Sequence, residues 1–175
     1  YQLEEYRDIE IRNMAAERLA EGYSLESVME SIYAKGRDNA RTPMQWTAGE
    51  HGGFTTGTPW LPVNENKAFI NAESALEDEN SVFHYYKKLI SLRKELTVFR
   101  DGKFTLLCPE DPQRFIYRRD NAREHLLVVC NFSGEMLDFA IPEEYRQAQK
   151  LISNYHTESE ALRPYEAVML YYERK

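Results

Sequence analysis

The feature that most constrains this chain is an irregular stretch, residues 37–73, between a helical part and a strand-forming part. Counting Gly36 at its edge, the stretch holds five of the eight glycines and three of the seven prolines. Glycine and proline at this density interrupt regular helices and strands. The stretch also holds Trp46, Phe54 and Trp60, which need a surface to pack against. A loop of this length is usually either functional or disordered, and its aromatic residues favour an ordered, functional loop.

Hydrophobic periodicity predicts two helices before this stretch and one after it. Apolar residues recur at helical spacing before Gly22, which is suited to terminate the first helix. Ser24 is suited to cap a second helix that ends at Gly36, and Ser81 to cap a third over residues 81–96. These helices do not make an evident core of their own, so the helical part is expected to belong to something larger.

From residue 98 onward the pattern changes to short strands. About six β-prone runs alternate with segments typical of turns. The continuous apolar run LLVVC suits a strand buried on both faces, whereas the alternation in RFIYRR suits a strand with one solvent-facing side. Short antiparallel strands at this spacing indicate a small β-sandwich. The runs are KFTLL, RFIYRR, HLLVVCNF, LDFAI, AQKLIS and AVMLYYE.

The charge balance and hydropathy argue against two classes of partner. Lys and Arg number 22 against 29 Asp and Glu, which gives a formal net charge of −7. A negative chain is unsuited to non-specific binding of nucleic acid or anionic lipid. No apolar run approaches the roughly 18–20 residues that span a bilayer, and the charged first residues are unlike a signal peptide. We therefore expect no nucleic-acid and no membrane partner.

The two cysteines, Cys108 and Cys130, lack the spacing of a zinc site and are too few for a disulfide framework. Each ends an apolar run, which predicts two buried free thiols. Reduced thiols are typical of the cytoplasm, where we expect the protein to be located. The four histidines have no metal-ligand spacing either, and we expect no metal and no cofactor.

Candidate binding residues are concentrated in GRDNARTPMQW, residues 36–46. Arg37 and Arg41 carry planar guanidinium groups that can grip a carboxylate or vicinal hydroxyls. Asp38 and Asn39 can cap turns or hydrogen-bond a polyhydroxy ligand. The structural alternative is that the arginine pair ties the loop to a neighbouring acidic residue. The loop aromatics have two readings as well, since they either stack on sugar rings or form a local core.

The same segment carries a resemblance to a known family. The run KGRDNARTPMQW, followed by HGGFTTGTPWLPVN, resembles the oligo-1,6-glucosidase and α-glucosidase branch of glycoside hydrolase family 13, the α-amylase family. Trehalose-6-phosphate hydrolases belong to the same branch. The similarity covers essentially the whole chain and continues through EEYRDIE, SVFHYYKKLISLRKEL, LLVVCNFS and LRPYEAVML.

The resemblance implies a fold. Such enzymes have a catalytic (β/α)₈ barrel followed by a C-terminal β-sandwich, and this chain corresponds to their last third. The expected fold class is an α+β fragment, with helices and a long loop from the last βα unit of the barrel and then an antiparallel β-sandwich. The expected domains are residues 1–97, the eighth βα loop and helix of the barrel, and residues 98–175, the sandwich.

The resemblance also implies an activity, namely retaining, exo-acting hydrolysis of α-1,6 or α-1,4 glucosidic bonds in short oligosaccharides. The family's catalytic carboxylates match no segment here, so we expect no catalytic residue, an inactive isolated chain, and a missing N-terminal barrel portion as partner. An arginine of the motif holds the non-reducing glucose in the family; Arg37 is the first candidate for that role and Arg41 the second. Asp38 and Asn39 are expected to shape the turn as part of the substrate-binding segment. The alternatives are a fragment of a trehalose-6-phosphate hydrolase and a stand-alone carbohydrate-binding or structural module.

Overall fold

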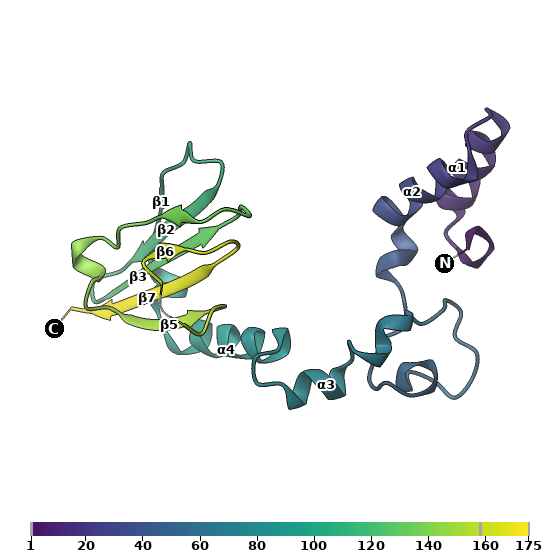
Figure 1. Ribbon diagram of the computed structural model, residues 1–175. Helices are drawn as coiled ribbons and strands as arrows, with labels where there is room; N and C mark the ends of the chain where they lie inside the picture. The colour runs from purple at the N-terminus through teal and green to yellow at the C-terminus, as the bar shows by residue number, and fades with distance from the viewer. Residues whose placement is uncertain (1, 158, 175) are drawn as a thin grey trace. The chain divides into compact units, whose positions relative to one another are not determined.

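The computed structural model describes residues 2–157 and 159–174 (Figure 1). The chain divides into two compact units, with the division between His84 and Tyr85. After a short 3-10 helix, η1 (Leu3–Glu5), the first unit begins with a packed helix pair, α1 (Ile9–Ala20) and α2 (Leu25–Lys35). Their shared core consists of Tyr6, Ile11, Ala15, Val28, Met29 and Ile32. The helical start predicted from apolar periodicity is confirmed.

The ends of the two helices follow from their capping residues. Ser24 caps α2 as predicted, since its hydroxyl accepts a hydrogen bond from Ser27 N at 3.2 Å. Gly22, in the turn between the helices, has a φ of +91°, a backbone conformation that favours glycine. At the end of α2, a Cβ on Gly36 would lie 2.7 Å from the Ile32 carbonyl oxygen, so a side chain there would push the following segment away.

The irregular stretch contains three short 3-10 helices, η2 (Arg37–Ala40), η3 (Glu50–Gly53) and η4 (Glu65–Ala68). A helix that the sequence pattern does not predict, α3 (Ala72–Glu77), begins at the last two residues of this stretch. Its N-cap is Asn71, whose side chain accepts a hydrogen bond from Ser74 N at 2.9 Å. The helix is short and carries Glu73 and Glu77, so it lacks the apolar periodicity from which helices are predicted.

The second unit is built on an antiparallel sheet. Two helices precede the strands, α4 (Val82–Glu95), whose first three residues belong to the first unit, and α5 (Val98–Asp101). The main sheet has the order β1-β2-β3-β7-β5, and β4 pairs with β6 in a second, two-stranded sheet. A short 3-10 helix, η5 (Glu143–Tyr145), precedes β5. The strands are β1 (Lys103–Leu107), β2 (Arg114–Asp120), β3 (Glu124–Asn131), β4 (Leu137–Asp138), β5 (Gln149–Ser153), β6 (Ala161–Leu162) and β7 (Ala167–Glu173).

Strand β3 is covered on both faces, as its continuous apolar sequence predicts. Leu126 and Val128 point into a core that also contains side chains of α4 and α5. Leu127 and Val129 point into a second core, with side chains of β4, β6 and η5. Because successive side chains of a strand alternate between faces, two layers bury all four. The layer on one face is helical and the layer on the other is the two-stranded sheet of β4 and β6. The sandwich thus consists of a five-stranded sheet and a much smaller two-stranded one.

Two features of this unit differ from the sequence predictions. Residues 98–101 form a helical turn instead of the beginning of a strand, and Gly102 N closes it by donating to the Val98 carbonyl at 3.1 Å. Cys130 is half-buried but Cys108 is exposed, so the prediction of two buried thiols is wrong for Cys108. The apolar run ends with β1, and Cys108 lies in the following turn with a φ of +52°. Both cysteines are free. None of the helices in the described part of the chain has the length and apolar character needed to cross a membrane.

The buried side chains of β3 make the sheet sensitive to truncation. Leu126 is fully buried, with 0% exposure, so Leu126→Ala is expected to lower the free energy of unfolding by about 3 kcal/mol through lost burial and the remaining cavity. Leu106, in β1, is 39% exposed, and Leu106→Ala is the matched control, with an expected loss below about 1 kcal/mol. Urea unfolding of both variants measures the difference. Equal losses would contradict this account of the core.

Candidate functional site

The candidate residues lie on η2, directly after the end of α2. Asp38 is fully buried, and its Oδ2 accepts hydrogen bonds from the backbone amides of Arg7 at 2.7 Å and Asp8 at 2.8 Å. It thereby fixes η2 to the segment that begins α1. Its other oxygen, Oδ1, is buried and accepts no hydrogen bond from the described residues.

Asn39 fixes η2 to the end of α2. Its Nδ2 donates to two carbonyls in the last turn of α2, those of Ile32 at 2.9 Å and Tyr33 at 3.1 Å. Carbonyls at a helix end need such partners from outside the helix, although that of Ile32 also accepts from Gly36 N at 2.7 Å. Its Oδ1 accepts a hydrogen bond from the hydroxyl of Tyr6 at 3.2 Å. Asp38 and Asn39 thus hold η2 against the start of α1 and the end of α2.

Arg37 is bound by two acidic residues of the first unit. Its Nε donates to Asp8 Oδ2 at 2.7 Å and its Nη2 donates to Asp8 Oδ1 at 3.0 Å, a bidentate pair. Nη2 also lies 2.9 Å from Glu10 Oε2. The structural alternative considered for the arginines, an ion pair with a neighbouring acid, is present. Half of the Arg37 side chain is nevertheless exposed.

Arg41 reaches the same carboxylate. Its Nη1 donates to Asp8 Oδ2 at 3.3 Å and lies 3.6 Å from Asp38 Oδ1. The Arg41 side chain is 45% exposed, whereas that of Asp8 is 1% exposed. The structure therefore brings together two half-exposed guanidinium groups over two buried carboxylates.

The charges of this cluster support one another. The hydrogen bond from Arg37 lowers the pKa of Asp8 from its ordinary value and outweighs the opposing effect of burial. The same hydrogen bond raises the pKa of Arg37. Asp8 and Arg37 are therefore ionised together at neutral pH, and buried carboxylates of this kind are tolerated because they are paired.

The lowered pKa of Asp8 predicts a pH-dependent contribution to stability. The ionised carboxylate stabilises the folded chain above its ordinary pKa of 3.8, and that stabilisation is lost as the pH falls through the lower folded-state pKa. Asp8→Asn, which keeps a good helix cap, is expected to be less stable than the parent chain at pH 7, with the difference shrinking toward pH 2. Thermal unfolding across this range measures it. Glu17→Gln, on the exposed face of α1, is the control, and an equal pH dependence there would contradict the role of Asp8.

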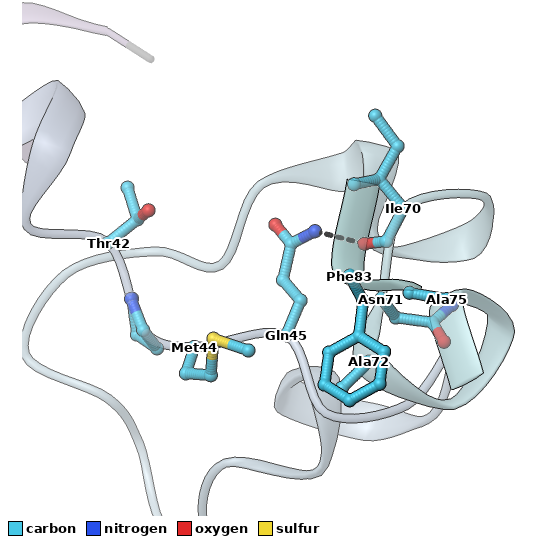
Figure 2. Close-up of a pocket in the computed structure, with 9 residues that line it drawn as sticks. Thr42, Met44, Gln45, Ile70, Asn71, Ala72, Ala75 and Phe83 are labelled. Carbon is cyan, nitrogen blue, oxygen red and sulfur yellow. Dashed lines mark hydrogen bonds between the residues drawn. The ribbon is translucent and has the colours of Figure 1, made fainter. Parts of the chain in front are cut away.

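The first unit also has an apolar groove with a volume of about 400 Å³. Its walls are held together by the Gln45 side chain, whose amide donates to the Ile70 carbonyl (Figure 2). Ala72 N adds a hydrogen bond to the Gln45 carbonyl at 2.9 Å. The walls are therefore held by one side-chain and one backbone hydrogen bond, while Met44, Ile70 and Phe83 stay substantially exposed. The apolar lining consists of Pro43, Met44, Ile70, Ala72, Ala75 and Phe83.

The aromatic residues of the irregular stretch are exposed rather than buried in a local core. Trp46, Phe54 and Trp60 each expose about half of their surface or more. Trp60 lines a second pocket, of about 430 Å³, together with Arg7 and Lys67. The sequence leaves two alternatives for these aromatic residues, a local core or a surface for stacking on sugar rings. Their exposure shows that they do not form a local core in the first unit.

The residue that sequence reasoning missed is Asp8. It lies in EEYRDIE, one of the segments that carry the family resemblance. The available signal was local, because an aspartate directly before a helical pattern is a favoured N-cap, and Asp8 does accept from Glu10 N at 2.8 Å. Nothing local indicates that the same carboxylate binds two arginines about thirty residues further on.

Comparison with protein families identifies a match in the first part of the chain. Residues 1–102 match the family described as alpha amylase, catalytic domain. Among curated relatives, the oligo-1,6-glucosidase of Halalkalibacterium halodurans is 50% identical over 173 residues, which cover 94% of this chain and 31% of that protein. The trehalose-6-phosphate hydrolase of Bacillus subtilis is 41% identical, with the same coverage of 94% and 31%. This chain thus spans about a third of the length of these relatives.

Solved structures agree with the sequence matches. The trehalose-6-phosphate hydrolase of Bacillus licheniformis superimposes with a TM-score of 0.92 at 38% identity, covering 99% of this chain and 33% of that chain. The trehalulose synthase MutB of Pseudomonas mesoacidophila superimposes with a TM-score of 0.87 at 31% identity, covering 98% and 32%. The expected arrangement, helices followed by an antiparallel sheet, is confirmed, and it corresponds to about a third of each of these larger structures.

Proposed function

Because this chain belongs to the α-amylase family of glycoside hydrolases, we propose that it is the C-terminal third of a retaining, exo-acting α-glucosidase. The substrates are short oligosaccharides with α-1,6 or α-1,4 glucosidic bonds. Residues 1–97 complete the catalytic barrel, and residues 98–175 form the sandwich that braces it. The relative most informative for this proposal is the oligo-1,6-glucosidase of H. halodurans, at 50% identity.

In this proposal the chain contributes to substrate binding, and the catalytic carboxylates lie in the remaining part of the enzyme. The observation that carries it is the pair of half-exposed arginines, Arg37 and Arg41, over the buried carboxylates of Asp8 and Asp38. Guanidinium groups held in place can donate several hydrogen bonds to the hydroxyls of a sugar. Arg37 is the first candidate for contact with the non-reducing glucose, and Arg41 is the second. Asp38 and Asn39 serve the same site by fixing η2.

The apolar groove of the first unit is the proposed packing surface for the rest of the catalytic domain. Its lining is apolar and its walls are fixed, and the neighbouring Phe69 and Val82 are highly exposed. Contiguous apolar patches are uncommon on the solvent-exposed surface of a folded protein and usually mark an interaction surface. The relatives are about three times as long as this chain, which leaves ample polypeptide to cover it.

A chimeric enzyme tests the proposal. The aligned segment of the H. halodurans oligo-1,6-glucosidase is replaced by this chain, and the matched control is the same protein with that segment deleted. The chimera is expected to hydrolyse isomaltose or maltose with retention of anomeric configuration, and the deletion control is expected to be inactive. A chimera that unfolds cooperatively but hydrolyses none of the tested glucosides would contradict the proposal.

The second candidate is a trehalose-6-phosphate hydrolase, which is favoured by the relative at 41% identity. Comparing isomaltose, maltose, sucrose and trehalose-6-phosphate as substrates of the protein in which this chain occurs separates the two. The proposed compartment is the cytoplasm, supported by the two free thiols of Cys108 and Cys130.

A further inference from the structure

We propose that Asp8 is a positioning residue of the sugar site, whose buried carboxylate holds Arg37 and Arg41 side by side so that both donate to the hydroxyls of one glucose unit. This inference deepens the proposed function and rests on it. It adds an acidic residue that contacts no ligand itself but determines where the ligand-binding groups lie.

The hydrogen bonds divide the donors of the two arginines into two sets. Arg37 uses Nε and Nη2 on Asp8 and Glu10, and Arg41 uses Nη1 on Asp8. The same Nη1 lies 3.6 Å from Asp38 Oδ1, which is an ion pair without a hydrogen bond. Within the described residues, the remaining nitrogens, Nη1 of Arg37 and Nε and Nη2 of Arg41, have no partner. Both side chains are about half exposed, so the cluster is open to a ligand. Two neighbouring guanidinium groups with free N–H donors suit vicinal hydroxyls, which present several acceptor oxygens close together.

Asp8 is itself held from several directions. Its Oδ1 accepts from Glu10 N at 2.8 Å, which makes it the cap of α1. Its backbone amide donates to Asp38 Oδ2 at 2.8 Å, and its side chain is 1% exposed. The carboxylate is therefore held by several hydrogen bonds and shielded from solvent and ligand. Any effect of Asp8 on substrate binding must pass through the arginines.

The cluster needs a shared carboxylate because two adjacent guanidinium groups repel each other. Asp8 contacts both and offsets that repulsion with charge that is hidden from solvent. Glu10 cannot replace it, because its side chain is 74% exposed and, in the part of the chain that the structure describes, it pairs with Arg37 but not with Arg41. Without the Asp8 charge, the arginines are expected to separate and lose their common orientation.

A double-mutant cycle in the H. halodurans chimera tests this role. Asp8→Asn and Arg37→Ala are each expected to lower kcat/KM for isomaltose about tenfold. The kcat/KM of the double variant is expected to lie within about threefold of that of the less active single variant. A loss in the double variant equal to the product of the single losses would overturn the inference, because Asp8 would then act independently of Arg37. An unchanged kcat/KM in Asp8→Asn would overturn it as well.

Chemical rescue supplies a readout that a purely structural residue would not move. Millimolar guanidinium added to Arg37→Ala is expected to restore part of the activity, since the Asp8 carboxylate can bind it in the vacated position. The same addition to the double variant is expected to restore nothing. Equal rescue in both variants would overturn the inference.

The matched control is another ion pair of this chain. Asp111 binds Arg114 in the second unit, with Nε 2.6 Å from Oδ2, and Asp111→Asn is expected to leave kcat/KM unchanged. If the unmodified chimera is inactive, the proposed function itself fails. If the chimera is active but the cycle is additive, only the role of Asp8 fails.

Discussion

Replacing Arg37 with alanine in the chimera is expected to lower kcat/KM for isomaltose at least about tenfold while leaving the fold intact. The residue is half exposed, and its side chain contributes to none of the hydrophobic cores of the first unit. Its loss removes hydrogen-bond donors that Asp8 holds in a fixed orientation. A hydrogen bond from such a charged, prepositioned donor to a sugar hydroxyl contributes strongly to the binding free energy. Steady-state kinetics with isomaltose, together with circular dichroism, measure both effects.

Two further variants make this result specific. Arg37→Lys keeps the positive charge but not the bidentate geometry, so most of the loss is expected to remain. Arg114→Ala removes an arginine from an equivalent pair with Asp111 in the second unit and is expected to leave kcat/KM unchanged. If Arg37→Ala has normal kinetics and Arg41→Ala does not, the sugar contact belongs to Arg41. If both have normal kinetics, this segment does not bind the substrate.

The isolated chain of 175 residues is expected to show no glucosidase activity toward any of the four substrates. Retaining hydrolysis needs two carboxyl groups about 5–5.5 Å apart on either side of the scissile bond, one as nucleophile and one as acid. The acidic pair that the first unit brings together, Asp8 and Asp38, is buried and already bound by arginines and backbone amides. Neither carboxylate is free to attack a sugar or protonate a leaving group.

Release of glucose from isomaltose, followed by a coupled assay over hours, checks this prediction. The isolated chain carrying Asp38→Asn is the control for contaminating host enzymes, because their activity would be the same in both preparations. Turnover by the parent chain that disappears in the Asp38→Asn preparation would mean that this unit contains its own catalytic carboxylate, and the proposed division of labour would be wrong.

Local sequence was sufficient for the parts of the fold that depend on neighbouring residues. The cap at Ser24, the end of α2 at Gly36 and the extent of β1 all follow from propensities and spacing over a few positions. The burial of β3 on both faces could be predicted too, because an unbroken apolar run leaves no face for water. The clustering of Arg37 and Arg41 could also be predicted, because the two residues lie four positions apart in one short segment.

The tertiary structure decided what those arginines bind. Asp8 and Arg37 are 29 positions apart, and they meet because the packing of α1 against α2 brings the start of one helix to the end of the other. The exposure of Cys108 was equally beyond local pattern, since it depends on which way the chain turns after β1 and on what the fold places beside that turn. Propensity and periodicity describe contacts between residues close in sequence. Charge pairing and burial depend on contacts made across the fold, which local pattern does not contain.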